Sequence, residues 1–216
     1  MKTKLFPTII VDDFLDNPDE LINFSKNLDF YYDEKYLWPG IRTRPLYEID
    51  KDLFIFLGNK ILYSYGLEKF EYNAEAEFQL VNKNYYSGWI HRDSPRVLTS
   101  IIYLNKKGNI NSGTSLYKPI ENYEKMQSNV DIIFKCRRNF IKNMAENDNY
   151  IITKKEKDAL KWQHEFYEEV LNVKNLYNRM FTFESGIWHS ANEYPNETME
   201  PRLTLVYFFF NIDTQF

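Results

Sequence analysis

Cysteine is almost absent from this chain of 216 residues, in which Cys136 is the single example. One cysteine excludes an internal disulfide and is typical of a protein made in a reducing compartment. Glycine is also scarce, with 7 residues, which excludes a collagen-like chain. Aromatic residues reach 18%, enough bulky apolar side chains for a folded core, so intrinsic disorder is excluded as well. We expect a single domain over residues 1–216.

Long hydrophobic runs are also lacking. The most apolar stretch, Leu203–Phe210, is too short to cross a bilayer as a helix. The apolar run Leu5–Val11 is interrupted by Pro7 and is too short for a secretory signal. Basic residues are not in excess, because 27 Lys and Arg face 31 Asp and Glu, for a net charge of -4. We therefore expect a cytoplasmic protein without a membrane partner, and the negative charge disfavours nucleic acid.

Residue patterns predict a domain that is mainly β with flanking helices. Helices are expected from Pro18 to about Leu28, after the cap-like Asn17, and from Asp50 to about Tyr65, where apolar residues recur at helical spacing. Strands are expected at Thr8–Val11, Ala74–Val81, Val97–Leu104, Ser115–Tyr117, Arg179–Glu184 and Leu203–Asn211. The nearly continuous apolar character of Val97–Leu104 predicts a strand buried on both faces.

The segment Pro119–Lys174 has a different pattern and is expected to be a helical insertion, not a second domain. One helix is predicted by the apolar spacing of Ile133, Cys136, Phe140 and Met144. A second begins with a capping box at Thr153 and is expected to run to about Asn172. The segment contains 10 basic and 10 acidic residues, so the net negative charge belongs to the rest of the chain.

Two of the three histidines can combine with an aspartate to hold a metal. His91 and Asp93 form a His-x-Asp pair, and residues two apart on an extended chain face the same side. His189, much later in the chain, is available as a third ligand. Two imidazoles and one carboxylate on one face of a metal leave positions open, as in non-haem Fe(II) oxygenases. A chance pair of surface residues is the alternative, because such a short motif is a weak signal by itself.

Further motifs surround this possible ligand set. In chain order they are His91-Arg92-Asp93, the apolar strand from Arg96 to Asn105, Ser112–Leu116, the stretch from Arg179 to His189, and Pro201–Thr204. In this order the sequence resembles the 2-oxoglutarate/Fe(II)-dependent dioxygenases, most nearly the prolyl 4-hydroxylase branch. The resemblance covers roughly residues 72–118 and 175–211. It implies a double-stranded β-helix, a jelly roll of the cupin type.

The resemblance also implies a role for each of the matching residues. His91, Asp93 and His189 would bind Fe(II) and form the catalytic centre. Arg202 would bind the distal carboxylate of 2-oxoglutarate through its fork of donors. The hydroxyl groups of Tyr103 and Thr204 would donate to the same carboxylate. The alternatives are a surface salt bridge for Arg202 and simple strand-end packing for Tyr103.

The implied reaction consumes O₂ and 2-oxoglutarate and releases succinate and CO₂, usually with hydroxylation of a substrate. An amino acid, a peptide or a small metabolite fits this chemistry. We expect the helical insertion to form a wall or lid of the substrate pocket; a helical pair that only covers a sheet is the alternative. A zinc-type hydrolase on the same three ligands and a non-catalytic binding module of the same fold are the competing functions.

The remaining polar residues are assigned structural roles. His164 and Cys136 lie on apolar helix faces and are expected to be packed there. A basic cluster, Lys135, Arg137, Arg138 and Lys142, is interpreted as a solvated helix face, with contact to a substrate phosphate as the alternative. Arg42 is interpreted as part of an edge-strand salt bridge.

Overall fold

The computed structural model describes residues 6–33, 38–81, 85–93, 95–121, 123–127, 130–147, 150–195 and 199–214. The strands are β1 (Ile9–Val11), β2 (Ile41–Arg42), β3 (Phe70–Val81), β4 (Leu98–Tyr103), β5 (Thr114–Pro119), β6 (Tyr167–Val173), β7 (Met180–Glu184), β8 (Trp188–Ala191) and β9 (Arg202–Thr214). The helices are α1 (Pro18–Ser25), α2 (Leu46–Ile49), α3 (Lys51–Tyr63), α4 (Tyr123–Gln127), α5 (Val130–Glu146) and α6 (Lys154–His164).

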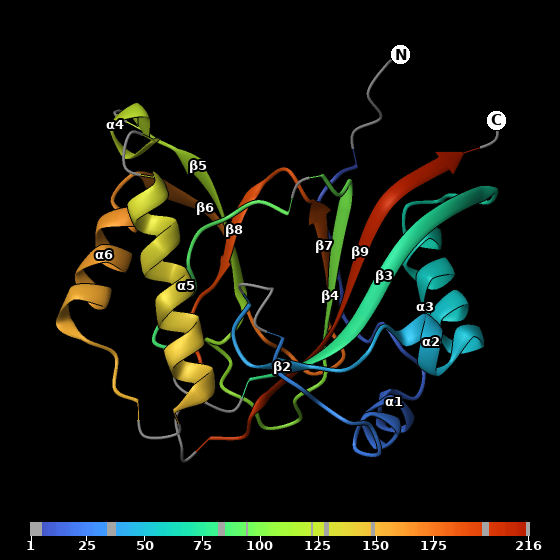
Figure 1. Ribbon diagram of the computed structural model, residues 1–216. Helices are drawn as coiled ribbons and strands as arrows, with labels where there is room; N and C mark the ends of the chain where they lie inside the picture. The colour runs from blue at the N-terminus through green and yellow to red at the C-terminus, as the bar shows by residue number, and fades with distance from the viewer. Residues whose placement is uncertain are drawn as a thin grey trace.

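The strands form two antiparallel sheets that face one another. The larger sheet has the order β1-β7-β4-β9-β3-β2, and the smaller has the order β6-β5-β8. Helices α1, α2 and α3 lie on the side of the larger sheet, while α5 and α6 lie at the other end of the molecule, beside the smaller sheet (Figure 1). This arrangement is the predicted jelly roll with flanking helices.

Strand β4 shows why the larger sheet is buried on both faces. Leu98 and Ile102 point outward into the core that the sheet shares with helices α1 to α3. Ile101 and Tyr103 alternate with them and pack between the two sheets, against Leu116 of the smaller sheet. Since both faces are covered, an uninterrupted apolar sequence is the stable choice, and the prediction for this strand is confirmed.

Strand β3 places polar side chains in the interior. Glu77 lies opposite Val206, and Gln79 lies opposite Thr204, on the face of the sheet that points toward the smaller sheet. Both side chains are buried. The alternation of apolar and polar residues along this strand therefore separates the packed outer core from a polar inner cavity.

The second helix of the insertion is shorter than predicted, and the prediction that it extends to Asn172 is wrong. Helix α6 ends at His164, and residues 167–173 form strand β6. Tyr167, Val170 and Leu171 fit a helical period as well as a strand, but β5 offers an unpaired edge whose N–H and C=O groups need partners. Pairing with β5 over Thr114 to Pro119 provides them. The helical part of the insertion thus ends before β6, not at Lys174.

The start of α6 follows the sequence prediction. The Thr153 hydroxyl accepts a hydrogen bond from the backbone N–H of Glu156, and the Glu156 carboxylate accepts from the N–H of Thr153 at 2.9 Å. Leu160 of this helix and Phe140 of α5 pack against Trp89 in a shared apolar cluster. None of the helices in the described part of the chain has the length and apolarity required to span a membrane.

Candidate metal and cosubstrate site

Backbone pairing brings His91 and His189 together. His189 lies in β8, and His91 forms an isolated antiparallel bridge with it. The N–H of His91 donates to the carbonyl of His189 at 3.0 Å, and the reverse bond measures 2.9 Å. The segment of His91 thereby extends the smaller sheet past β8, which explains how two distant histidines become neighbours.

The two imidazoles and the Asp93 carboxylate converge on one point. Their ligand atoms all lie within 4.8 Å of one another. Nε2 of His189 is 3.3 Å from one Asp93 oxygen, and Nε2 of His91 is 3.7 Å from the other. The Nδ1 atoms donate to backbone carbonyls, that of Trp89 at 2.8 Å and that of Ile187 at 2.9 Å. These bonds orient both rings with Nε2 toward the carboxylate, the usual preparation of metal-binding histidines.

Asp93 is itself held by neighbouring groups. Its N–H donates to the Ser185 carbonyl at 2.9 Å, and the Thr99 hydroxyl donates to its carboxylate at 3.1 Å. Thr99 and Ser185 are joined by a hydroxyl–hydroxyl bond of 2.8 Å. Such supporting contacts fix the direction of a ligating carboxylate.

Burial and neighbouring charges tune the ligand set for a cation. Burial, helped by the charge of Arg137, lowers the pKa of His91 to about 3, so this imidazole is neutral at physiological pH. Burial alone favours a protonated Asp93, but hydrogen bonding to His189 and the positive charge of Arg96 hold its pKa well below the ordinary value. A neutral imidazole and an ionised carboxylate are the forms that bind a metal. The residues present therefore fit a divalent ion such as Fe(II).

Acid is expected to destabilise the metal-free protein. Between the ordinary histidine pKa of 6.5 and about 3, the unfolded chain protonates His91 whereas the folded chain does not, so stability falls as the pH falls through this window. Above pH 6.5 His91 is neutral in both the folded and the unfolded chain, so it adds nothing to the pH dependence of stability. The lowered pKa of Asp93 adds stability that is lost as the pH falls below 3.8. Burial also lowers the pKa of His164, which contributes in the same direction as His91.

The measurement is the thermal midpoint of the metal-free protein from pH 7.5 to 4.5. We expect a steady decline, a shallower slope in His91→Gln and in His164→Gln, and the shallowest slope when both are replaced. A His91→Gln variant with the parental slope contradicts this account.

The proposed cosubstrate residues lie together on two neighbouring strands. Arg202, at the start of β9, is 4% exposed, and its Nε donates to the Ser112 carbonyl at 2.8 Å. Its guanidinium carbon lies 5.6 Å from the centre of the Tyr103 ring. Thr204 lies opposite Tyr103 in the β4–β9 pair, and its hydroxyl is buried with no hydrogen-bond partner among the described residues. The Tyr103 hydroxyl donates to Thr114 at 2.9 Å.

The buried side chains of Arg202 and Thr204 fit an anion. No ion pair joins Arg202 to an acidic residue in the described part of the chain, so its buried charge needs a negative partner from outside. The buried hydroxyl of Thr204 also needs a partner. A carboxylate beside Arg202 satisfies both. The surface salt bridge considered for Arg202 is excluded for the described residues, because the side chain is buried.

A single cavity of about 90 Å³ connects the two ends of the site. Its lining includes His91, Asp93 and His189 at one end and Arg202 and Thr114 at the other. Apolar walls come from Ile101, Val206 and Phe208. The long stretch between His189 and Arg202 in the sequence does not separate these residues in space. Gly113 is required nearby, because a Cβ there would lie 1.8 Å from the Val173 carbonyl oxygen.

Several cavity residues were not singled out as functional from the sequence. They are Trp38, Pro39, Arg42, Gln79, Arg137 and Tyr194. Arg42 does form the expected salt bridge, to Glu77 at 2.8 Å, but the pair is buried and not at an exposed edge. The guanidinium also stacks 3.9 Å from the centre of the Trp38 ring. The alternation of polar residues along β3 marks one polar face of this strand in the sequence. Only the arrangement of the two sheets shows that this face points into the cavity.

Glu77→Ala is expected to destabilise the protein strongly. The substitution leaves the Arg42 charge buried without its partner, which typically costs about 3–5 kcal/mol. Chemical denaturation measures the effect, and Glu71→Ala, at an exposed position of the same strand, is the matched control. If Glu77→Ala changes the free energy of unfolding by less than about 0.5 kcal/mol, the range of ordinary surface substitutions, the pairing of Arg42 with Glu77 is contradicted.

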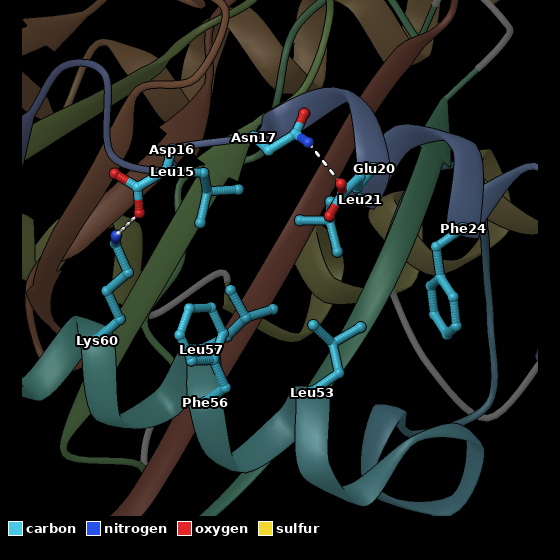
Figure 2. Close-up of a pocket in the computed structure, with 10 residues that line it drawn as sticks. All are labelled: Leu15, Asp16, Asn17, Glu20, Leu21, Phe24, Leu53, Phe56, Leu57 and Lys60. Atoms are coloured by element: carbon cyan, nitrogen blue, oxygen red, sulfur yellow. Dashed lines mark hydrogen bonds and ion pairs between the residues drawn. The ribbon is translucent and has the colours of Figure 1, made fainter.

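A larger hollow, of about 410 Å³, lies between α1 and α3 on the other side of the larger sheet (Figure 2). Leu21, Leu53 and Leu57 are among its apolar lining residues. Its charged side chains already have partners, since Lys60 contacts Asp16 at 2.9 Å and Glu20 accepts a hydrogen bond from Asn17 at 2.5 Å. Among the described residues that line the hollow there is no cluster of metal-binding side chains, whereas the smaller cavity between the sheets contains His91, Asp93 and His189.

Comparisons with solved structures identify the fold. The chain is similar to HygX from Streptomyces hygroscopicus, solved with nickel and 2-oxoglutarate bound, at a TM-score of 0.54 and 9% identity, covering 94% of this chain and 82% of HygX. It is also similar to SnoN, a non-heme alpha ketoglutarate dependent epimerase from nogalamycin biosynthesis, at a TM-score of 0.51 and 12% identity, covering 96% and 80%. A Pseudomonas putida prolyl-4-hydroxylase matches at a TM-score of 0.45 and 14% identity, covering 94% and 91%. No curated protein matches the sequence.

The chain therefore has the double-stranded β-helix fold of the 2-oxoglutarate/Fe(II)-dependent oxygenases. Residues 2–209 match the family described as "Family of unknown function (DUF6445)", and the chain belongs to that family.

Proposed function

We propose that this protein is an Fe(II)- and 2-oxoglutarate-dependent oxygenase that acts on a small molecule or peptide, with hydroxylation as the expected outcome. One observation carries the proposal: a His-Asp-His cluster and a buried arginine without an acidic partner among the described residues line the same cavity. The cluster fits a divalent metal, and the arginine fits a carboxylate. The fold agrees with this function.

Each residue has a task in this function. His91 and His189 present Nε2, and Asp93 presents its carboxylate, so that these three residues would hold the metal. When bound, the iron and 2-oxoglutarate supply oxidation by O₂ coupled to the release of succinate and CO₂. Arg202 orients the cosubstrate by its distal carboxylate. Phe183, whose ring centre is 4.7 Å from that of His189, helps to exclude water from the metal.

Two competing functions make different predictions. A zinc-type hydrolase needs a general base near the metal, but the Glu77 carboxylate on the inner face is engaged by Arg42. It also leaves Arg202 without a function. A non-catalytic module predicts ligand binding without turnover.

Anaerobic reconstitution followed by exposure to O₂ tests the proposal. We expect one Fe(II) per chain, tighter 2-oxoglutarate binding in its presence, and slow succinate formation that a substrate accelerates. Zinc in place of iron is expected to occupy the same ligands without succinate formation. Iron and 2-oxoglutarate binding with no succinate under any condition favours the non-catalytic module. Hydrolysis with zinc and no 2-oxoglutarate binding favours the hydrolase.

A further inference from the structure

The short segment that leads into His91 is held on both of its edges. On one side it pairs with β8, where the N–H of Gly88 donates to the Ala191 carbonyl at 2.9 Å and His91 exchanges two backbone bonds with His189. Gly88 permits this close approach, because a Cβ there would lie 2.5 Å from the carbonyl oxygen of Ala191. On the other side the segment contacts α6, the second helix of the insertion.

Gln163, near the end of α6, takes the place of a neighbouring strand on this second side. Its side-chain oxygen accepts a hydrogen bond from the N–H of Ile90 at 3.0 Å, and its side-chain nitrogen donates to the carbonyl of Ile90 at 2.8 Å. Gln163 is 5% exposed and Ile90 is 2% exposed, so both backbone groups need partners within the protein. The next residue, His164, donates from Nε2 to the carbonyl of Gly88 at 2.9 Å.

The two bonds of Gln163 reach the His91 ring through planar peptide groups. The N–H of Ile90 and the carbonyl of Trp89 belong to one peptide group, so a bond to this N–H fixes the direction of the carbonyl. That carbonyl accepts from Nδ1 of His91 at 2.8 Å. The carbonyl of Ile90 and the N–H of His91 belong to the next peptide group, and this N–H donates to the carbonyl of His189 at 3.0 Å. One carboxamide therefore fixes both peptide groups that set the backbone and the ring of His91.

The same chain of hydrogen bonds affects how strongly His91 donates electrons. Hydrogen bonds that are linked through a peptide group polarise one another. The bond from the N–H of Ile90 to Gln163 makes the carbonyl of Trp89 a better acceptor for Nδ1–H of His91. A stronger bond at Nδ1 makes Nε2 more basic, and Nε2 is the atom that lies 3.7 Å from the Asp93 carboxylate.

We propose that Gln163 is a positioning residue of the metal site, which fixes His91 through the two peptide groups beside Ile90 and so sets how tightly the protein holds its metal. This inference rests on the proposed metal-dependent function. It gives the insertion a second task, because α6 then supports a metal ligand as well as covering apolar surface. Gln163 itself touches neither the metal nor the substrate.

Two substitutions at position 163 test the inference. Gln163→Met keeps the length of the side chain and removes both bonds to Ile90, and it is expected to weaken Fe(II) and Co(II) binding about 10- to 100-fold, the usual effect of losing a group that supports a metal ligand. The visible absorption spectrum of the Co(II) protein is expected to change, because the position of His91 changes. Gln163→Glu keeps an acceptor for the N–H of Ile90 and is expected to lie between Gln163→Met and the parent. Metal affinities are measured without O₂ at a temperature at which every variant is folded.

The matched control is Leu160→Val, one turn earlier on the same helix. Leu160 is 2% exposed and packs in the apolar cluster of the insertion, so the loss of a methylene lowers the thermal midpoint without removing a hydrogen bond. This variant is expected to bind Co(II) with the affinity and the spectrum of the parent. His164→Gln retains a donor for the carbonyl of Gly88 and is also expected to bind metal like the parent.

Hydrogen exchange tests the inference in the unaltered protein. If contact with α6 strengthens metal binding, then metal binding strengthens the contact with α6 to the same extent, because coupling between two binding events is reciprocal. Addition of Co(II) is therefore expected to slow amide exchange in residues 88–91 and in α6, and to leave α3, on the far side of the larger sheet, unchanged. In Gln163→Met the protection of α6 by the metal is expected to be lost.

Three results overturn the role of Gln163. The first is parental metal affinity and an unchanged Co(II) spectrum in Gln163→Met, which would leave the residue with a purely structural role. The second is an equal loss of metal affinity in Leu160→Val, and the third is protection of residues 88–91 by Co(II) without protection of α6. The third decides the question even if Gln163→Met does not fold. In all three cases the parent binds metal, whereas failure of the proposed function is recognised by a parent that binds neither metal nor 2-oxoglutarate.

Discussion

Replacing His91 and Asp93 together by alanine is expected to abolish iron uptake and all turnover. The double variant removes two of the three converging ligands and leaves His189 alone, which cannot hold a divalent ion in a site with open positions. Iron content after anaerobic reconstitution and succinate formation are the two measurements. Each single variant, His91→Ala or Asp93→Ala, is expected to lose most of both.

The control for this experiment is His164→Gln. His164 is the remaining histidine of the chain, and its Nε2 is bonded to the Gly88 carbonyl at 2.9 Å, away from the metal-ligand cluster. This variant is expected to take up iron like the parent. A double variant His91→Ala/Asp93→Ala that binds iron as well as the parent would falsify the assignment of the site.

Arg202→Ala is expected to weaken 2-oxoglutarate binding by about 2–5 kcal/mol, or roughly 30- to 5,000-fold. The substitution leaves a carboxylate of the cosubstrate in a dry cavity without its charged partner. Titration of the iron-loaded protein with 2-oxoglutarate in the absence of O₂ measures the effect directly. The Michaelis constant for 2-oxoglutarate is expected to rise in parallel.

Two milder substitutions calibrate this result. Arg202→Lys keeps the charge but not the fork of donors. Its affinity for 2-oxoglutarate is expected to lie between those of the parent and of Arg202→Ala. Tyr103→Phe removes a buried hydroxyl and is expected to weaken 2-oxoglutarate binding by about 1–3 kcal/mol. An unchanged Michaelis constant for 2-oxoglutarate in Arg202→Ala rules out the role given to this arginine.

The helical insertion lies beside the cavity between the two sheets. Helices α5 and α6 share an apolar cluster with Trp89 and Ile90, next to His91, and α5 also contributes Arg137 to the cavity. The helices therefore cover apolar surface and form a wall of the site at the same time. Movement of this wall as a lid stays a prediction, as does the cytoplasmic location.

Local pattern and chain order determined a large part of this protein. The apolar strand at Val97–Leu104, the capping box at Thr153 and the His-x-Asp pair are local signals, because each depends on residues that are close in sequence. The resemblance carried by the motifs around His91, His189 and Arg202 predicted the jelly roll, and four of the residues that it selected, His91, Asp93, His189 and Arg202, line one cavity.

The tertiary structure decided what depends on partners distant in sequence. Residues 167–173 became strand β6 because the edge of β5 needed hydrogen-bond partners, although their spacing also suits a helix. The polar face of β3 turned inward because its other face packs against the helices, and this made Arg42 and Glu77 a buried pair. Arg137 was one of four similar basic residues until the packing of α5 turned it alone toward the cavity that His91, Asp93 and His189 line. Exposure and burial are set by the whole fold, so local sequence cannot distinguish a solvated arginine from one that lines a cavity.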